Sequence, residues 1–272
     1  MMLSSSGFLT IGDTQIEYRV SGDPAAPPAI VMLHEGLGSA ALWGDFPARL
    51  AAATGVTVLA YSRAGYGASS PVALPRPLSY MHDEATQVLP PLLDAIGFRR
   101  GLLLGHSDGA SIAAIYAGGT QDHRVRGLVL IAPHFVVEDV GLAAIREART
   151  AYEQGDLKAR LARWHKHVDS AFYGWNGAWL DPGFRDWDIS ESLAYIRVPV
   201  QIVQGENDQY GTIRQVEIAQ GECYCPVEVA LIPGVGHAPQ REQPDVTLAA
   251  IAGFAERILR QHHEGAVGAS PQ

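Results

Sequence analysis

The sequence predicts an α/β fold in which a mostly parallel central sheet is flanked by helices and carries an inserted helical cap. Short apolar runs typical of strands buried on both faces alternate along the chain with helical patterns. Such alternation builds a mostly parallel sheet with helices on both faces. The alternation stops between residues 134 and 195, where no convincing strand occurs. This segment of roughly 60 residues is too long for a plain loop in a compact domain, so we expect it to be a helical insertion.

The strand candidates are short. The first, 15–20, alternates polar and apolar residues as a half-exposed strand does, whereas most of the later ones are continuous apolar runs. The remaining strands are expected at 29–33, 56–60, 102–104, 128–131, 200–203 and 227–232, and the helices of the core at 40–53, 80–96, 110–117 and 246–259. The last helix follows Pro244, a residue suited to a first helical turn.

These patterns indicate one core domain with an insertion rather than two domains in tandem. We expect the core at 1–133 and 196–263, the helical cap at 134–195, and a disordered tail at 264–272, which is rich in small residues. Within the cap, helical patterns cover 142–152 and 157–168, followed by an aromatic segment. Ligands of open parallel sheets bind outside the carboxyl ends of the strands, so an insertion leaving a strand end would cover that site.

Composition excludes several classes of protein. The chain has 272 residues, 47% of them apolar and 18% charged, which is too apolar for a disordered chain. Its net charge of −9 argues against generic binding to nucleic acid. Cys223 and Cys225 lie too close together to bridge without strain and lack the second pair that a structural zinc site needs. With no apolar run long enough to span a bilayer and no signal-peptide pattern, we expect a cytoplasmic protein.

The most informative motif is Gly105-His106-Ser107-Asp108-Gly109. It follows an apolar strand candidate and precedes a helix of small residues, which is the context that a G-x-S-x-G nucleophile requires. The serine sits on a very sharp turn, so its neighbours must be tiny. Its hydroxyl is then exposed at a helix N-terminus, where free N–H groups favour developing negative charge. We therefore predict that Ser107 is a nucleophile.

A serine nucleophile needs a base, and the base needs a carboxylate to orient it. His237 is the expected base, because two glycines and two prolines around it build a loop directly after the last strand candidate. Asp208 follows the strand at 200–203 and is the expected acid. Glu206 is adjacent and could compete, and residues 138–139 offer a second acidic location.

Acyl transfer also needs donors for an oxyanion. We expect one donor to be the backbone N–H of Asp108, directly after the nucleophile. The other is expected from the loop at 33–39, with the N–H of Gly36 contributing.

With these residues in place, the chain resembles the serine hydrolases of the α/β-hydrolase superfamily, in the branch with a helical cap. The resemblance covers nearly the whole chain and is carried by His34-Glu35-Gly36 with Gly38, by 62–69, by the nucleophile motif, by 205–208 and by Gly236-His237. It implies the α/β-hydrolase fold and hydrolysis of an ester, thioester, lactone or amide, with no cofactor and no metal. A glycine pattern at 65–67 faintly suggests a dinucleotide site, but the third glycine is missing and Pro71 prevents a helix from starting.

The sequence departs from the family pattern at two acidic residues. Glu35 replaces a common glycine, and Asp108 stands where a small or apolar residue is frequent. In this respect the motif is similar to that of the biphenyl-hydrolase-like, valacyclovirase-type esterases, which act on amino-acid esters. Negative charge beside an oxyanion hole must be offset. Glu35 is expected to pair with Arg63 or His34 or to contact substrate, and for Asp108 a structural role and a substrate contact stay equally open.

The predicted function is hydrolysis of a small-molecule ester by a Ser107-His237-Asp208 triad. Trp164, Phe172 and Trp175 are candidate linings of the acyl pocket, because the cap should cover it. The expected partner is a small-molecule substrate, with no nucleic acid and no membrane, and a homodimer stays open. A C–C bond hydrolase and a hydroxynitrile lyase would share the triad. A non-catalytic binding protein is disfavoured, because all three residue types occur in order.

Overall fold

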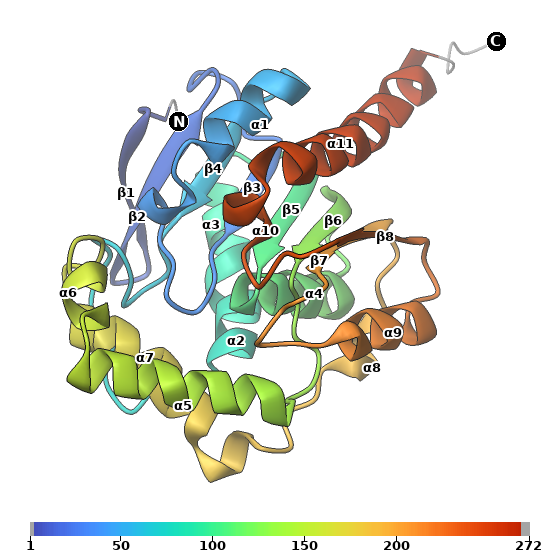
Figure 1. Ribbon diagram of the computed structural model, residues 1–272. Helices are drawn as coiled ribbons and strands as arrows, with labels where there is room; N and C mark the ends of the chain where they lie inside the picture. The colour runs from blue at the N-terminus through green and yellow to red at the C-terminus, as the bar shows by residue number, and fades with distance from the viewer. Residues whose placement is uncertain (1–2, 268–272) are drawn as a thin grey trace.

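A computed structural model describes residues 3–267 of the chain. Its centre is an eight-stranded sheet with the strand order β1-β2-β4-β3-β5-β6-β7-β8, in which β2 runs antiparallel to both of its neighbours and the other pairs are parallel (Figure 1). The strands are β1 (Ser6–Ile11), β2 (Thr14–Ser21), β3 (Ile30–Leu33), β4 (Val58–Tyr61), β5 (Gly101–His106), β6 (Val125–Ile131), β7 (Val200–Gly205) and β8 (Val227–Ile232). This architecture confirms the predicted fold class.

Helices cover both faces of the sheet (Figure 1). On one face lie α1 (Phe46–Thr54) and α11 (Pro244–Val267), which pack against each other. The opposite face carries α2 (Tyr80–Asp83), α3 (Leu89–Ala95), α4 (Asp108–Thr120) and α9 (Ile213–Glu222). Four further helical elements are short: η1 (Ala41–Trp43), η2 (Glu84–Val88), η3 (Pro182–Phe184) and α10 (Pro239–Glu242).

Two apolar cores result, because successive side chains of a strand point to opposite faces. In β3, Val31 and Leu33 belong to the core beneath α4, whereas Ile30 and Met32 belong to the core beneath α1 and α11. All four residues are buried, which explains why this strand appears in the sequence as an unbroken apolar run.

The insertion between β6 and β7 forms the cap. It contains α5 (Asp139–Gln154), α6 (Leu157–Leu161), α7 (Val168–Leu180) and α8 (Ser190–Leu193). The first three lie across the end of the sheet away from α11 (Figure 1), whereas α8 packs on α4 and α9 of the core. Within the described residues, no helix is both long and apolar enough to cross a bilayer.

Some sequence-based expectations differ from the structure. The edge strand β1 is missing from them, because only Leu9 of its six residues is buried and the apolar alternation is weak. The helix expected at 157–168 is instead α6 followed by turns, and α7 begins at Val168. The tail expected at 264–272 overlaps the end of α11, which reaches Val267, and its last residues, 268–272, lie outside the described residues, so this expectation stays a prediction.

Candidate active site

Ser107 lies at the turn between β5 and α4, with φ 53° and ψ −119°. A non-glycine residue pays a steric penalty in this left-handed region, so the turn stores strain at the serine. The residues two positions before and after it must lack a Cβ. A Cβ on Gly105 would overlap the backbone of Gly109, and one on Gly109 would overlap the carbonyl of Leu33. The G-x-S-x-G pattern is therefore a packing requirement of this turn.

The catalytic groups expected from the sequence meet at the carboxyl ends of the strands. The Ser107 hydroxyl and His237 Nε2 are 2.9 Å apart, and His237 Nδ1 lies 2.9 and 2.8 Å from the two carboxylate oxygens of Asp208. A carboxylate only accepts, so Nδ1 carries the imidazole proton. Nε2 is then free to accept the hydroxyl proton of Ser107, which is the arrangement that nucleophilic activation requires.

Asp208 is oriented and kept ionised by its own surroundings. It accepts hydrogen bonds from the Tyr210 amide at 2.8 Å and from Gln204 Nε2 at 2.9 Å. Burial favours the neutral acid, but the hydrogen bond and charge of His237, together with the hydrogen bond from the Tyr210 amide, outweigh it and lower the pKa of Asp208. Glu138, the alternative acidic location, instead accepts hydrogen bonds from the Thr212 amide and hydroxyl at the start of α9.

The loop that carries His237 is held from two sides. Glu242 of α10 accepts the N–H of Gly236 at 2.8 Å and the N–H of Ala238 at 3.1 Å, so one carboxylate holds both neighbours of the histidine. His106 Nε2 donates to the carbonyl of His237 at 2.8 Å, since a carbonyl only accepts. These contacts limit the movement of the imidazole relative to Ser107.

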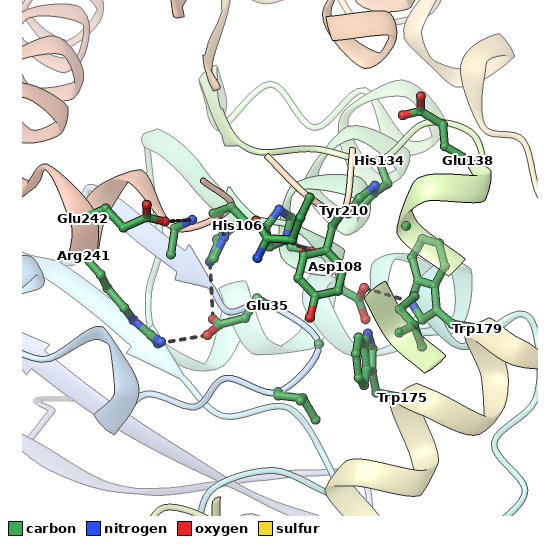
Figure 2. Close-up of a pocket in the computed structure, with 18 of the residues that line it drawn as sticks. Glu35, His106, Asp108, His134, Glu138, Trp175, Trp179, Tyr210, Arg241 and Glu242 are labelled. Carbon is green, nitrogen blue, oxygen red and sulfur yellow. Dashed lines mark hydrogen bonds and ion pairs between the residues drawn. The ribbon is translucent and has the colours of Figure 1, made fainter. Parts of the chain in front are cut away.

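A cavity of about 370 Å³ opens over Ser107. Gly36 and Asp108 line it, as do the cap residues Ile145, Trp175 and Trp179. Figure 2 shows Asp108 between Tyr210 and the two tryptophans. The cavity therefore lies between the expected nucleophile, the expected oxyanion donors and an apolar wall supplied by the cap.

The negative charge of Glu35 is compensated by a partner that the sequence did not reveal. Its carboxylate pairs with Arg241 at 2.9 Å and lies 3.5 Å from His106 Nδ1 (Figure 2). Burial favours the neutral acid, but His106 and Arg241 outweigh it and hold the pKa of Glu35 well below its usual range. The expected partners, Arg63 and His34, bond to the backbone carbonyl of Glu35 instead. The predicted side-chain pairing was therefore wrong.

The second acidic residue, Asp108, is fully buried and both of its carboxylate oxygens are occupied. Tyr80 donates to one oxygen at 2.6 Å and the indole of Trp179 donates to the other at 3.2 Å. Arg63 Nη2 lies 3.8 Å from the same carboxylate, which offsets its charge. These contacts support the structural role that the sequence left open.

A family model described as the alpha/beta hydrolase family matches residues 30–250, well over half of the chain. The chain belongs to the alpha/beta hydrolase family. The finding agrees with the eight-stranded sheet and confirms the resemblance seen in the sequence.

Relatives of this alpha/beta hydrolase carry several activities in their names. A proline iminopeptidase of Lactobacillus helveticus is 24% identical over 289 residues, which cover 91% of this chain and 95% of the relative. A bacterial membrane phospholipase A has a TM-score of 0.75 at 20% identity, covering 93% of this chain and 86% of that one. The enol-lactonase of Burkholderia xenovorans LB400 has a TM-score of 0.71 at 18% identity, covering 91% and 99%. At these identities the two structures show the fold alone.

Two of the three aromatic residues expected in the acyl pocket of this hydrolase lie elsewhere. Trp164 is 44% exposed and borders a separate surface hollow. Phe172 is fully buried inside the cap, stacked on Tyr152 with ring centroids 3.7 Å apart. Only Trp175 lines the cavity, and its indole occupies the place that a Cβ on Gly36 would need. The predictions for Trp164 and Phe172 were wrong. Trp164 lies in the turn after α6 and not on a helix, and the sequence does not reveal which side of α7 faces the cavity.

Several cavity residues of this hydrolase were missed in the sequence. Tyr210 follows Asp208 by two positions, and its ring centroid lies 4.7 Å from that of His237. Its proximity to the acid in the sequence could have suggested it. Trp179 belongs to the aromatic segment already noticed there. Arg241 and His134 carry no motif that distinguishes them from surface residues.

His134 is a buried neutral group beside the candidate triad. Its ring centroid lies 5.5 Å from that of His237, and burial together with the nearby His237 lowers its pKa to about 3. It therefore stays uncharged wherever the protein is folded at ordinary pH. Among the described residues, no group of three or more His, Cys, Asp or Glu side chains could hold a metal ion.

Proposed function

We propose that this alpha/beta hydrolase cleaves a small-molecule carboxylic ester through an acyl-enzyme on Ser107. The observation that carries the proposal is the continuous hydrogen-bonded chain from the Ser107 hydroxyl through His237 to Asp208, at the floor of the cavity. Three groups of the right kinds, in the right protonation pattern, converge on a strained turn at the start of α4. That arrangement is the one acyl transfer requires.

In the first half of the reaction, His237 Nε2 takes the proton of the Ser107 hydroxyl while the oxygen attacks the ester carbonyl carbon. The carbonyl π electrons move onto oxygen, and the backbone N–H groups of Gly36 and Asp108 stabilise that negative charge. When the intermediate collapses, the bond to the alcohol breaks. His237 returns the proton to the departing alkoxide, which leaves Ser107 acylated.

In the second half, water replaces the alcohol. His237 takes a proton from the water as it attacks the acyl carbon, and the same N–H groups stabilise the second intermediate. The bond to the Ser107 oxygen then breaks, the serine recovers its proton from His237, and the acid is released. Asp208 stabilises the imidazolium in both halves without accepting its proton.

The charges around the cavity favour an acyl group without an ammonium substituent. Every glutamate or aspartate that lines the cavity already has protein partners: Glu35 has Arg241, Asp108 has Tyr80 and Trp179, Glu138 has Thr212 and Gln215, and Glu242 has the amides of Gly236 and Ala238. A substrate ammonium would have to compete with these contacts. This observation distinguishes the proposed activity from release of an N-terminal amino acid, the activity that the name of the Lactobacillus relative denotes.

The test is a panel of substrates assayed with the wild type and with Ser107→Ala. The panel contains p-nitrophenyl esters of short and medium acids, a lactone, an aminoacyl p-nitroanilide, a cyanohydrin and a vinylogous diketone. We expect ester turnover that the substitution lowers by at least ~10³-fold. Unchanged ester turnover by Ser107→Ala would refute the proposal. Faster turnover of the anilide, cyanohydrin or diketone than of any ester would replace it with the corresponding activity.

A further inference from the structure

Arg63 is a completely buried arginine next to the proposed oxyanion hole. It follows β4, its side chain is 1% exposed, and its guanidinium lies over the ring of Tyr66 at 5.0 Å. One nitrogen, Nη2, donates to the backbone carbonyl of Glu35 at 3.1 Å and lies 3.8 Å from the carboxylate of Asp108. Both contacts lead to an expected oxyanion donor. Glu35 shares a peptide unit with the N–H of Gly36, and Asp108 is expected to supply its own N–H.

The link to the first donor runs through a single peptide unit. The carbonyl of Glu35 and the N–H of Gly36 belong to the same peptide, which is trans, since the only cis bond among the described residues is Leu74–Pro75. In a trans peptide the N–H points opposite to the C=O. Holding the Glu35 carbonyl on one side therefore directs the Gly36 N–H to the other.

A second contact from the same loop strengthens this hold. The Arg63 backbone N–H donates to His34 Nε2 at 3.1 Å, so Nε2 has no proton and the proton of the neutral ring is on Nδ1. His34 Nδ1 then donates to the Glu35 carbonyl at 2.6 Å. Burial and the nearby Arg63 cation lower the pKa of His34 well below its usual value, which keeps the ring in this neutral form.

The turn itself contributes one more donor to the same oxygen. The N–H of Gly38 donates to the Glu35 carbonyl at 3.0 Å, which closes a tight turn over 35–38. The carbonyl thus accepts from a guanidinium, an imidazole and an amide. A reversed peptide would lose all three hydrogen bonds and leave these buried donors without partners, which is energetically unfavourable.

The link to the second donor is electrostatic. Asp108 supplies the other oxyanion N–H from its own backbone, and its carboxylate is held by Tyr80, by Trp179 and by the nearby Arg63 cation. Arg63 therefore lies between the two residues that flank the oxyanion, and compensates the negative charge that Asp108 places there.

We propose that Arg63, together with His34, is a positioning residue that holds the Glu35–Gly36 peptide in the orientation required for the oxyanion hole. The inference rests on the proposed acyl transfer through Ser107. It gives Arg63 a role in catalysis without contact to the substrate, and it explains why a guanidinium is buried at this place.

The first experiment compares Arg63→Met with Arg76→Met. Arg76 is the matched control, because its guanidinium also lies over the Tyr66 ring but donates to the carbonyl of Ala64 instead of that of Glu35. We expect Arg63→Met to lower kcat of the ester reaction by about 10²-fold, as loss of one oxyanion donor does, with KM changed by less than ~3-fold. Arg76→Met should keep kcat within ~3-fold of wild type.

A second readout separates positioning from general damage to the structure. A boronic acid that adds to Ser107 forms a tetrahedral adduct whose oxygen occupies the oxyanion hole, whereas a non-reactive substrate amide binds without using it. We expect Arg63→Met to weaken the boronic acid by the same factor as kcat/KM and to leave the amide nearly unaffected. Equal weakening of both ligands would contradict the proposal.

Substitution at His34 tests the proposal even if Arg63→Met does not fold. In His34→Asn the side-chain amide replaces Nδ1 and can still donate to the Glu35 carbonyl, whereas in His34→Gln the amide replaces Nε2 and retains only the contact to the Arg63 N–H. We expect kcat to be better retained in His34→Asn than in His34→Gln. The reverse order, or wild-type kcat in both, would overturn the inference.

The outcomes also separate this inference from the proposed function. Ester turnover that does not need Ser107 would refute the function. Turnover that needs Ser107 but is unchanged by Arg63→Met and His34→Gln would refute only the positioning role.

Discussion

Trp179, in the cap helix α7, donates a hydrogen bond from its indole nitrogen to the carboxylate of Asp108, the residue that directly follows the proposed nucleophile, Ser107. Tyr80 of α2 donates to the other oxygen of the same carboxylate, so the cap and the core meet at the first residue of α4. The cap is therefore connected to the turn that carries Ser107. The same contacts leave Asp108 no free oxygen for a substrate.

The substitution Asp108→Asn should damage the fold without changing substrate preference. An amide loses one acceptor and removes the negative charge that lies 3.8 Å from the buried Arg63 cation. Breaking a buried pair by removing one partner costs about 3–5 kcal/mol, so we expect a loss of about 3 kcal/mol in the free energy of unfolding, measured with urea. Asp186→Asn, at an exposed position in the cap, is the matched control.

Substrate preference is measured with an amino-acid ester and its desamino analogue. We expect kcat/KM to fall by the same factor for both when Asp108 becomes Asn. A loss confined to the amino-acid ester would show that Asp108 reads a substrate cation and would contradict a purely structural role for its carboxylate.

The residue Glu242 should control the position of His237, the proposed catalytic base. Its carboxylate holds the N–H groups of Gly236 and Ala238, and displacing a catalytic group by about 1 Å can cost ~10²-fold in rate. We expect Glu242→Ala to lower kcat by ~10- to 100-fold with little change in KM, and Glu242→Gln to be intermediate because one acceptor oxygen remains. Steady-state kinetics with p-nitrophenyl esters gives both constants.

The control for this experiment is Glu206→Ala. Glu206 is exposed and lies in the loop of Asp208, so it also tests whether this neighbour contributes to the acid function. We expect wild-type kcat in Glu206→Ala. Wild-type kcat in Glu242→Ala as well would show that the histidine loop keeps its position without the carboxylate.

The stability of the protein should depend on pH through His134. An unfolded histidine takes up a proton near pH ~6.5, whereas the folded His134 stays neutral down to about 3. Below pH ~6.5 the unfolded state therefore binds more protons, so stability falls as pH falls, by up to ~1.4 kcal/mol per pH unit. The contribution is complete above pH ~6.5 and decreases toward the folded pKa.

Urea unfolding at pH 7 and pH 5 measures this effect. From pH 7 to pH 5, the free energy of unfolding of His134→Gln should fall by about 2 kcal/mol less than that of wild type, since the glutamine side chain does not titrate. His123→Gln, at an exposed position, should behave like wild type. The pKa of the buried His34 is also lowered, so it contributes to the decrease of stability with falling pH in every variant, including His134→Gln. An unchanged decline in His134→Gln would contradict the assignment.

Local constraints explain what the sequence revealed. The turn around Ser107 has room only for glycine at positions 105 and 109, so the two glycines in the motif predict the sharp turn. The order of Ser107, Asp208 and His237 follows from successive strand ends, which meet at one edge of a parallel sheet. The fold class and the catalytic candidates can therefore be predicted from short segments of the sequence.

Contacts between distant segments explain what the sequence did not reveal. Arg241 pairs with Glu35 across 206 positions, and neither residue indicates the other. The orientation of cap side chains depends on where each helix begins and ends. Because α7 begins at Val168, Phe172 lies inside the cap, and because α6 ends at Leu161, Trp164 lies in an exposed turn. The edge strand β1 buries so little that its apolar pattern is weak.

Formation of a covalent intermediate on Ser107 is the central claim, and one measurement tests it directly. The protein is treated with a fluorophosphonate, digested, and searched by mass spectrometry for the modified residue. We predict a single adduct on Ser107, formed in parallel with loss of esterase activity and abolished in His237→Ala. Loss of activity with Ser107 unmodified, or an adduct on another residue, would contradict the proposed mechanism.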